Sequence, residues 1–149
     1  MIGESQKEND LFYTCSLIEY ISRKTKNTKK VIVEKLKKEN IEKIYELADV
    51  YHCENIEKVA NEFIEKANIK LGTYDNISEC KYDVPTYWDI GKVYKRLIIM
   101  VNKDESKYVE TLIEVLSSWI IEKIDNYNSN MYYENPGYIY ECYKSGKII

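Results

Sequence analysis

The sequence predicts an all-α protein, a single-domain bundle of about seven short-to-medium helices. Apolar residues recur at intervals of three and four along most of the chain, which is the period of an amphipathic helix. Residues that favour helix N-termini precede several of these stripes. The pentapeptide Glu-Asn-Ile-Glu-Lys occurs twice, at residues 39–43 and 54–58, and an apolar stripe follows each copy. We therefore expect a stack of short antiparallel helices.

The N-terminal half of the bundle, residues 9–67, is expected to contain four helices, preceded by a flexible tail over residues 1–8. The third and fourth helices are expected over about 40–52 and 55–67. Each of the four begins at a residue whose side chain can accept a backbone N–H of the first turn: Asn9 or Asp10, Thr28, Asn40 and Asn55.

Residues 68–84 interrupt the helical pattern. Gly72, Asp75 and Asn76 are turn formers, and Val84 precedes a proline, which disfavours the helical backbone at that position. We expect a loop here, with a two-stranded ribbon as the alternative. At this chain length the two halves are expected to share one core, so that residues 9–149 form one domain.

The C-terminal half, residues 85–149, is expected to contain three helices. Thr86 and Asp89 form the pattern Thr-x-x-Asp, a close relative of the capping box, so a helix over about 87–101 is predicted. The longest helix of the protein is expected over about 105–127. Asn135 and the proline after it predict the start of a last helix, which Gly146 would end in a left-handed conformation.

Composition and charge exclude several classes of protein. Hydrophobic residues make up 44% and charged residues 32%, as in ordinary globular domains. No apolar run approaches the ~20 residues of a membrane span. The first ten residues are polar and charged, which does not fit a secretory signal. The four cysteines include no C-x-x-C pair, so free thiols and a cytoplasmic location are expected.

No pattern of catalytic or ligand-binding residues is visible. The sole histidine, His52, adjoins Cys53, and neighbours on a helix point about 100° apart, so they are not expected to face each other. Zinc-type spacings, an acidic calcium loop and a glycine-rich phosphate loop are all missing from the sequence. We therefore expect a protein that is not an enzyme and holds no metal or cofactor.

Tyrosine and tryptophan residues are the strongest indication of function. They gather around the start of the fifth helix and in the last 23 residues, and such side chains anchor many protein–protein interfaces. Whether they fill the core or form an interface stays open at this point. The residues predicted to bind a partner protein are Tyr87, Trp88, Tyr132, Tyr133, Tyr138 and Tyr140.

A basic segment, residues 23–38, carries eight cations against one acid, Glu34. A helix-turn-helix that contacts nucleic-acid phosphates is the alternative function. The net charge of −3 and the presence of only two arginines argue against it. The lysines that would bind nucleic acid are Lys29, Lys30, Lys35, Lys37 and Lys38.

The patterns at residues 11–21, 44–45, 49–52 and 85–94 resemble a family of short uncharacterised helical proteins of low-GC bacteria. The abundance of Lys, Ile, Asn and Tyr also fits an AT-rich bacterial or phage genome. Genes of that family lie near genes for ADP-ribosyltransferase-like toxins. The resemblance thus implies a neutralising or accessory protein, antitoxin-like or immunity-like, of a toxin–antitoxin or defence locus. It would act by covering a partner protein; a homodimer is also left open.

Overall fold

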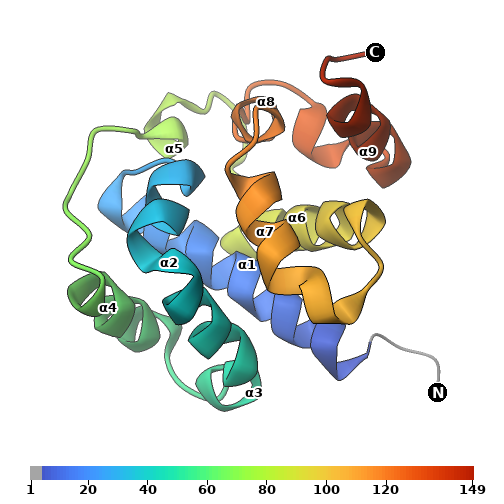
Figure 1. Ribbon diagram of the computed structural model, residues 1–149. Helices are drawn as coiled ribbons and strands as arrows, with labels where there is room; N and C mark the ends of the chain where they lie inside the picture. Colours follow the sequence, from blue (N-terminus) through green and yellow to red (C-terminus); the bar gives the residue numbers. More distant parts are fainter. Residues whose placement is uncertain (1–4) are drawn as a thin grey trace.

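The computed structural model describes residues 5–149, and helices are the only regular secondary structure in that range (Figure 1). Six helices have nine or more residues: α1 (Gln6–Thr25), α2 (Lys29–Glu46), α4 (Ile56–Lys66), α6 (Tyr87–Val101), α7 (Tyr108–Leu116) and α9 (Pro136–Ser145). The shorter elements are α3 (Ala48–Tyr51), α5 (Asn76–Glu79), α8 (Ile120–Ile124) and the 3₁₀ turns η1 (Glu105–Lys107) and η2 (Met131–Tyr133). The predicted all-α, single-domain class is confirmed, and residues 68–84 form no ribbon.

Helix α1 lies at the centre of the bundle. It packs most extensively against α6 and α2, and also contacts α3, α4 and α7 (Figure 1). Every residue from 13 to 19 is buried, so α1 is enclosed around its circumference there and not along a single stripe. Helices α3 and α4 lie at one end of the molecule and α9 at the other. The two halves of the sequence therefore share one core.

A glycine allows α1 and α6 to approach closely. A Cβ atom at Gly91 of α6 would lie 2.0 Å from the Ser16 Oγ and 2.9 Å from the Ser16 Cα of α1. Contacts this short do not occur between real atoms, so any side chain at position 91 would force the helices apart. The close packing of the two central helices depends on this residue.

The helix starts of the N-terminal half agree with the sequence at two places. The Thr28 Oγ1 accepts a hydrogen bond from the Val31 amide at 3.4 Å and begins α2. The Asn55 Oδ1 accepts one from the Glu57 amide at 2.8 Å and begins α4. Both predicted N-caps are confirmed.

The start of α1 was predicted wrongly. Ser5 is the N-cap, because its Oγ accepts a hydrogen bond from the Glu8 amide at 3.1 Å, and the helix begins at Gln6. Asn9 and Asp10 therefore lie inside the helix. Residues 6–8 of the expected tail are helical, and residues 1–4 lie outside the described part of the chain.

A helical segment begins just before the first Glu-Asn-Ile-Glu-Lys copy, after a kink at Lys37, but Asn40 does not cap it. Asn40 is buried, and its Nδ2 donates a hydrogen bond to the Leu36 carbonyl at 2.8 Å. The predicted second and third helices are present as the two segments of α2, which Lys37, a non-helical residue at φ 65° and ψ 164°, separates. The second segment ends at Glu46, before α3, and does not continue to residue 52. Buried side chains on both sides of this kink, among them Ile32 and Ile44, hold the two segments against the core.

The loop that follows α4 is fastened to the end of α1. The Gly72 amide donates a hydrogen bond to the Thr25 carbonyl at 2.7 Å, and the Tyr74 amide donates one to the Lys26 carbonyl at 2.9 Å. The Asn27 Nδ2 donates to the Lys70 carbonyl at 2.8 Å. This loop, which contains the short helix α5, thus has a defined path across the surface.

The C-terminal half contains one correction. Thr86 and Asp89 form the predicted capping box of α6, and Asn135 caps α9, which ends at Gly146 with φ 76°. The expected long helix over 105–127 is wrong, since this region divides into η1, α7 and α8, and α1 is the longest helix. The Ser118 Oγ donates to the Val115 carbonyl at 2.6 Å, a local bond that competes with helix continuation.

Replacing Gly91 by alanine should destabilise the protein by about 2 kcal/mol, because overpacking a tight helix contact costs roughly 1–3 kcal/mol. Urea denaturation followed by circular dichroism would measure the free energy of unfolding. Lys92→Ala, at an exposed position one residue further along α6, is the matched control and should change stability little. Equal stability of the two variants would contradict the close approach.

Candidate functional site

The six residues predicted to bind a partner occupy three places in the structure. Tyr87 and Trp88, in the first turn of α6, are partly buried against α1. The Tyr87 ring lies edge-on to Tyr20 with ring centres 5.1 Å apart, and Trp88 lies 5.6 Å from Phe12. These two aromatic residues contribute to the junction of α1 and α6 more than to the outer surface.

Tyr138 and Tyr140 belong to α9 and are also partly buried. The Tyr138 hydroxyl donates a hydrogen bond to the Ile149 carbonyl at 2.5 Å. The Lys144 ammonium lies 5.0 Å from the centre of the Tyr140 ring. Both tyrosines therefore have partners within their own end of the chain.

Tyr132 and Tyr133 lie side by side in η2, and they differ in exposure. Tyr133 is 68% exposed, whereas Tyr132 is partly buried. Their rings meet edge to face at 4.9 Å, and Tyr132 makes a second edge-to-face contact with Tyr127 at 5.5 Å. Tyr133 thus projects from a row of three rings in edge-to-face contact whose inner member, Tyr127, is buried.

A hollow lies on each side of these two tyrosines. The first, a groove of about 400 Å³, is formed with α6 and the start of α9, and its charged residues are Asp89, Lys92, Arg96 and Glu134. The second, of about 580 Å³, is bounded by residues 127–130 and by Tyr82, which is 69% exposed. Both hollows include Tyr132 and Tyr133 in their walls. We call the two hollows with Tyr82, Tyr132 and Tyr133 the η2 surface.

The backbone beneath the η2 surface is held in place. Asn128 bridges to the loop that contains Tyr82: its Nδ2 donates to the Glu79 carbonyl at 3.0 Å, and its Oδ1 accepts from the Lys81 amide at 2.7 Å. Met131, the first residue of η2, is buried in the core. Exposed tyrosines on such a backbone lose little conformational freedom when they bind, which favours recognition.

The five lysines of the nucleic-acid alternative do not form one surface. Lys29 is completely buried, while the others are exposed. Lys38 lies 3.7 Å from Glu42 and 3.6 Å from Glu110, so two carboxylates offset part of its charge. Three of the five lysines are therefore exposed and form no ion pair within the described part of the chain: Lys30, Lys35 and Lys37.

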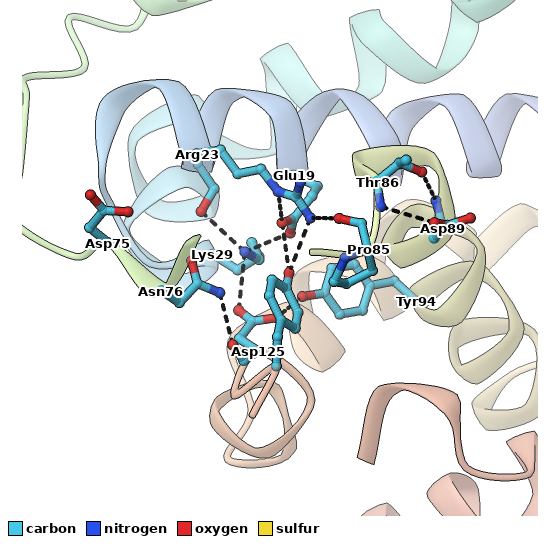
Figure 2. A network of polar contacts seen from close by, with 12 residues as sticks. Glu19, Arg23, Lys29, Asp75, Asn76, Pro85, Thr86, Asp89, Tyr94 and Asp125 are labelled. Atoms are coloured by element: carbon cyan, nitrogen blue, oxygen red, sulfur yellow. Dashed lines mark hydrogen bonds and ion pairs between the residues drawn. The ribbon is translucent and has the colours of Figure 1, made fainter. Parts of the chain in front are cut away.

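Lys29 belongs instead to a cluster of buried charges, shown in Figure 2. Its Nζ lies 2.6 Å from the Glu19 Oε1 and 3.0 Å from the Asp125 Oδ2, and it donates to the Ser22 Oγ at 3.1 Å. Glu19 and Asp125 are buried as well. Because the ammonium touches both carboxylates, it ties α2 to α1 and to the residue that follows α8 (Figure 2).

Arg23 completes the charge balance of the cluster. Its Nε lies 2.7 Å from the Glu19 Oε2, and a second guanidinium nitrogen donates to the Pro85 carbonyl at 2.8 Å (Figure 2). The Tyr127 hydroxyl donates to the Glu19 Oε2 at 2.9 Å, and the Tyr94 hydroxyl donates to the Asp125 Oδ1. Two cations thus face two anions, with Tyr94 of α6 and Tyr127, two residues after Asp125, bonded to the anions.

The pKa values of the two buried carboxylates are shifted in opposite directions, although burial acts to raise both. Burial alone would raise the pKa of Glu19, but Lys29 and Arg23 hold it below its ordinary value. Burial raises the pKa of Asp125 to about 6, since Lys29 opposes this effect only in part and the Glu19 charge adds to it. Asp125 is thus the member of the cluster that titrates near neutral pH.

The cluster was not predicted from the sequence. Lys29 was interpreted as a surface residue, and Glu19 and Asp125 were not assigned any role. One signal was present, because Glu19 lies between Ile18 and Ile21 in an otherwise apolar stretch. Its partner Asp125 is distant in sequence and belongs to a region predicted as continuous helix, so the pairing could not be inferred.

Comparison with protein-family models, curated proteins and solved structures finds no match. The resemblance to the helical family of low-GC bacteria therefore stays a prediction. Within residues 5–149, no helix is long and apolar enough to cross a membrane. The same residues contain no group of three or more His, Cys, Asp or Glu side chains placed to hold a metal ion.

Replacing Lys29 by methionine should lower the free energy of unfolding by about 3–5 kcal/mol, because the change leaves two carboxylates buried beside each other without their shared cation. Chemical denaturation would measure the loss. Lys30→Met removes the same charge at the exposed neighbouring position and should have little effect. A loss of similar size in both variants would show that the buried pairing is not the cause.

The raised pKa of Asp125 predicts a pH dependence of stability. A folded-state pKa of about 6 against an ordinary 3.8 means that protonation favours the folded protein, so this carboxyl contributes more stability at pH 5 than at pH 7. The lowered pKa of Glu19 acts in the opposite direction, but only below its ordinary value of 4.5. Thermal unfolding of the wild type and of Asp125→Asn at both pH values would separate the contribution of Asp125 from that of Glu19.

The melting temperature of the wild type, relative to that of Asp125→Asn, should rise as the pH falls from 7 to 5. The two proteins differ only at residue 125, so the comparison removes the contributions of all other residues. A difference between the two proteins that does not change with pH would contradict the prediction.

Proposed function

We propose that this protein acts by binding another protein through the η2 surface. The observation that supports the proposal best is the exposure of Tyr133 on a backbone segment that hydrogen bonds and a buried methionine hold in place. Exposed apolar side chains that gather in one patch indicate an interaction site more strongly than single scattered ones do. Tyr82, which is equally exposed, lies on the same surface.

The two hollows give the surface a shape that a partner can recognise. A partner side chain can enter the groove of about 400 Å³ beside Tyr133, while Tyr133 and Tyr82 contact the partner's own surface. Aromatic residues next to pockets are typical of interface hot spots. The groove carries two cations and two anions, which favours a partner with charges of both signs around an apolar centre.

The biological role that we propose is neutralisation or assistance of the partner by covering its working face. Covering a surface requires no catalytic residue in the binding protein. The resemblance to the helical family supports an ADP-ribosyltransferase-like toxin as the first partner to test. On this proposal the protein is an antitoxin-like or immunity-like component of a bacterial or phage locus.

Nucleic-acid binding through the basic segment has less support. Lys29 is buried in the charge cluster and cannot reach a phosphate, and Lys38 has acidic neighbours. Phosphate binding depends on several exposed cations acting together. We therefore place protein binding first.

Tyr133→Ala should weaken binding to the partner by about tenfold or more, the usual loss at an aromatic hot spot of ~2 kcal/mol. Co-expression of the protein with a candidate toxin, followed by co-purification and titration calorimetry, would measure it. The thermal stability of this variant should stay close to that of the wild type, since the Tyr133 ring is mostly exposed.

Leu71→Ala serves as the matched control. Leu71 is an apolar residue with 75% exposure in the loop before α5, outside the η2 surface. This variant should bind like the wild type. Equal affinities of Tyr133→Ala and Leu71→Ala for the partner would refute the assignment of the interface to η2. A photo-crosslinker placed at position 133 during co-expression with the toxin gives a second test. If it captures no partner, the proposal itself is refuted.

A further inference from the structure

The groove of about 400 Å³ beside η2 has apolar walls from two helices. Helix α6 contributes Val93 and Leu97, and α9 contributes Pro136 and Ile139. Apolar surface is driven to leave water, so walls of this kind favour an apolar or aromatic side chain as the occupant.

Most of the charged residues in the groove have no partner within the protein. Lys92 and Arg96 lie one turn apart on α6 and are exposed, and Glu134 follows the last residue of η2. None of these three forms an ion pair within the described part of the chain. Asp89 differs, because its carboxylate accepts a hydrogen bond from the Thr86 amide at 2.9 Å in the capping box. The groove therefore presents two unpaired cations and one unpaired anion to its occupant.

The segment whose chemistry fits this groove lies directly beside it. An apolar or aromatic side chain with an acidic neighbour would fill the groove and meet Lys92 and Arg96. Tyr133 is 68% exposed, and the residue after it is Glu134. Both residues also line the groove. One face of the protein thus carries a projecting ring and, next to it, a groove of matching chemistry.

We propose that a second copy of this chain covers the η2 surface when no other partner is bound. In this two-fold dimer the Tyr133 ring of each copy enters the groove of the other copy. Glu134, which is adjacent in the chain, then approaches the Lys92 and Arg96 side chains of the receiving copy. A two-fold interface uses the same patch on both copies and so requires a self-complementary surface, as this one is.

The dimer is expected to be weak because its interface is small. A buried aromatic side chain removes roughly 150–250 Å² from water, so two rings and equal areas of the receiving walls amount to about 600–1,000 Å². Stable specific complexes bury at least ~1,200 Å². Such a dimer keeps the exposed tyrosine out of water and still leaves the surface available to a partner that binds more tightly. The inference goes beyond the proposed function, since it concerns the same surface without that partner.

Sedimentation velocity of the full-length protein measures the dimer directly. The 17.7 kDa chain should sediment as a monomer near about 1 μM and mainly as a dimer near about 300 μM. Tyr133→Ala should raise the dissociation constant about tenfold or more, as at other aromatic hot spots. Leu71→Ala, which removes an exposed apolar side chain outside the η2 surface, is the matched control and should dimerise like the wild type.

Exchange of the charges at the edge of the groove tests the arrangement of the two copies. Arg96→Glu should weaken the dimer about tenfold, because it places a carboxylate where Glu134 of the other copy approaches. The double variant Arg96→Glu/Glu134→Arg restores opposite charges across the interface and should recover most of the affinity. Since these two residues form no ion pair within one chain, the recovery reports a contact between copies. Circular dichroism and the melting temperature show whether each variant is folded.

Three results would overturn the inference: a wild type that stays monomeric at about 300 μM, a Tyr133→Ala variant that dimerises like the wild type, or a double variant that dimerises as weakly as Arg96→Glu. The inference and the proposed function can fail separately. A monomeric wild type whose partner complex is weakened by Tyr133→Ala would refute the dimer alone. A dimer that Tyr133→Ala dissociates, in a protein whose partner complex the same change leaves intact, would refute the η2 surface as the partner's site alone.

Discussion

The contact of Lys29 with Glu19 and Asp125 is the interaction on which the rest of the structure depends. It joins α1, α2 and the end of α8 inside the core, and the bonds of Arg23 and Tyr94 extend it to Pro85 and α6. Buried ions are tolerated only when each is paired and hydrogen-bonded, as these are. An apolar core could pack in several ways, whereas this pairing is satisfied in one arrangement.

The cluster also determines where the exposed tyrosines lie. Tyr127 donates its hydroxyl proton to Glu19, and its ring contacts Tyr132, which in turn contacts Tyr133. A continuous series of contacts therefore runs from the buried charges to the η2 surface. The segment after α8 begins at Asp125, so the position of η2 follows from the position of that residue in the core.

The first turn of α6 lies between the η2 surface and an aromatic cluster formed with α1 and the end of α3. Asp89 lines the groove beside η2, while Trp88, one residue earlier, packs against Tyr13 and His52. Consecutive helical residues point in different directions, so one turn supports both regions. Tyr87 and Trp88, predicted as contact residues, act in the structure as the support between them.

The sequence by itself determined the helical class, the caps at Thr28, Asn55, Thr86 and Asn135, and most of the core stripes, because these depend on residues three or four positions apart. It also indicated the tyrosines of η2. The tertiary structure alone decided that Asn40 is buried and does not cap a helix, that residues 105–127 divide into three elements, and that Lys29 lies in the core. Each of these outcomes depends on contacts between residues far apart in the chain, such as Lys29 with Asp125, and local spacing carries no information about them.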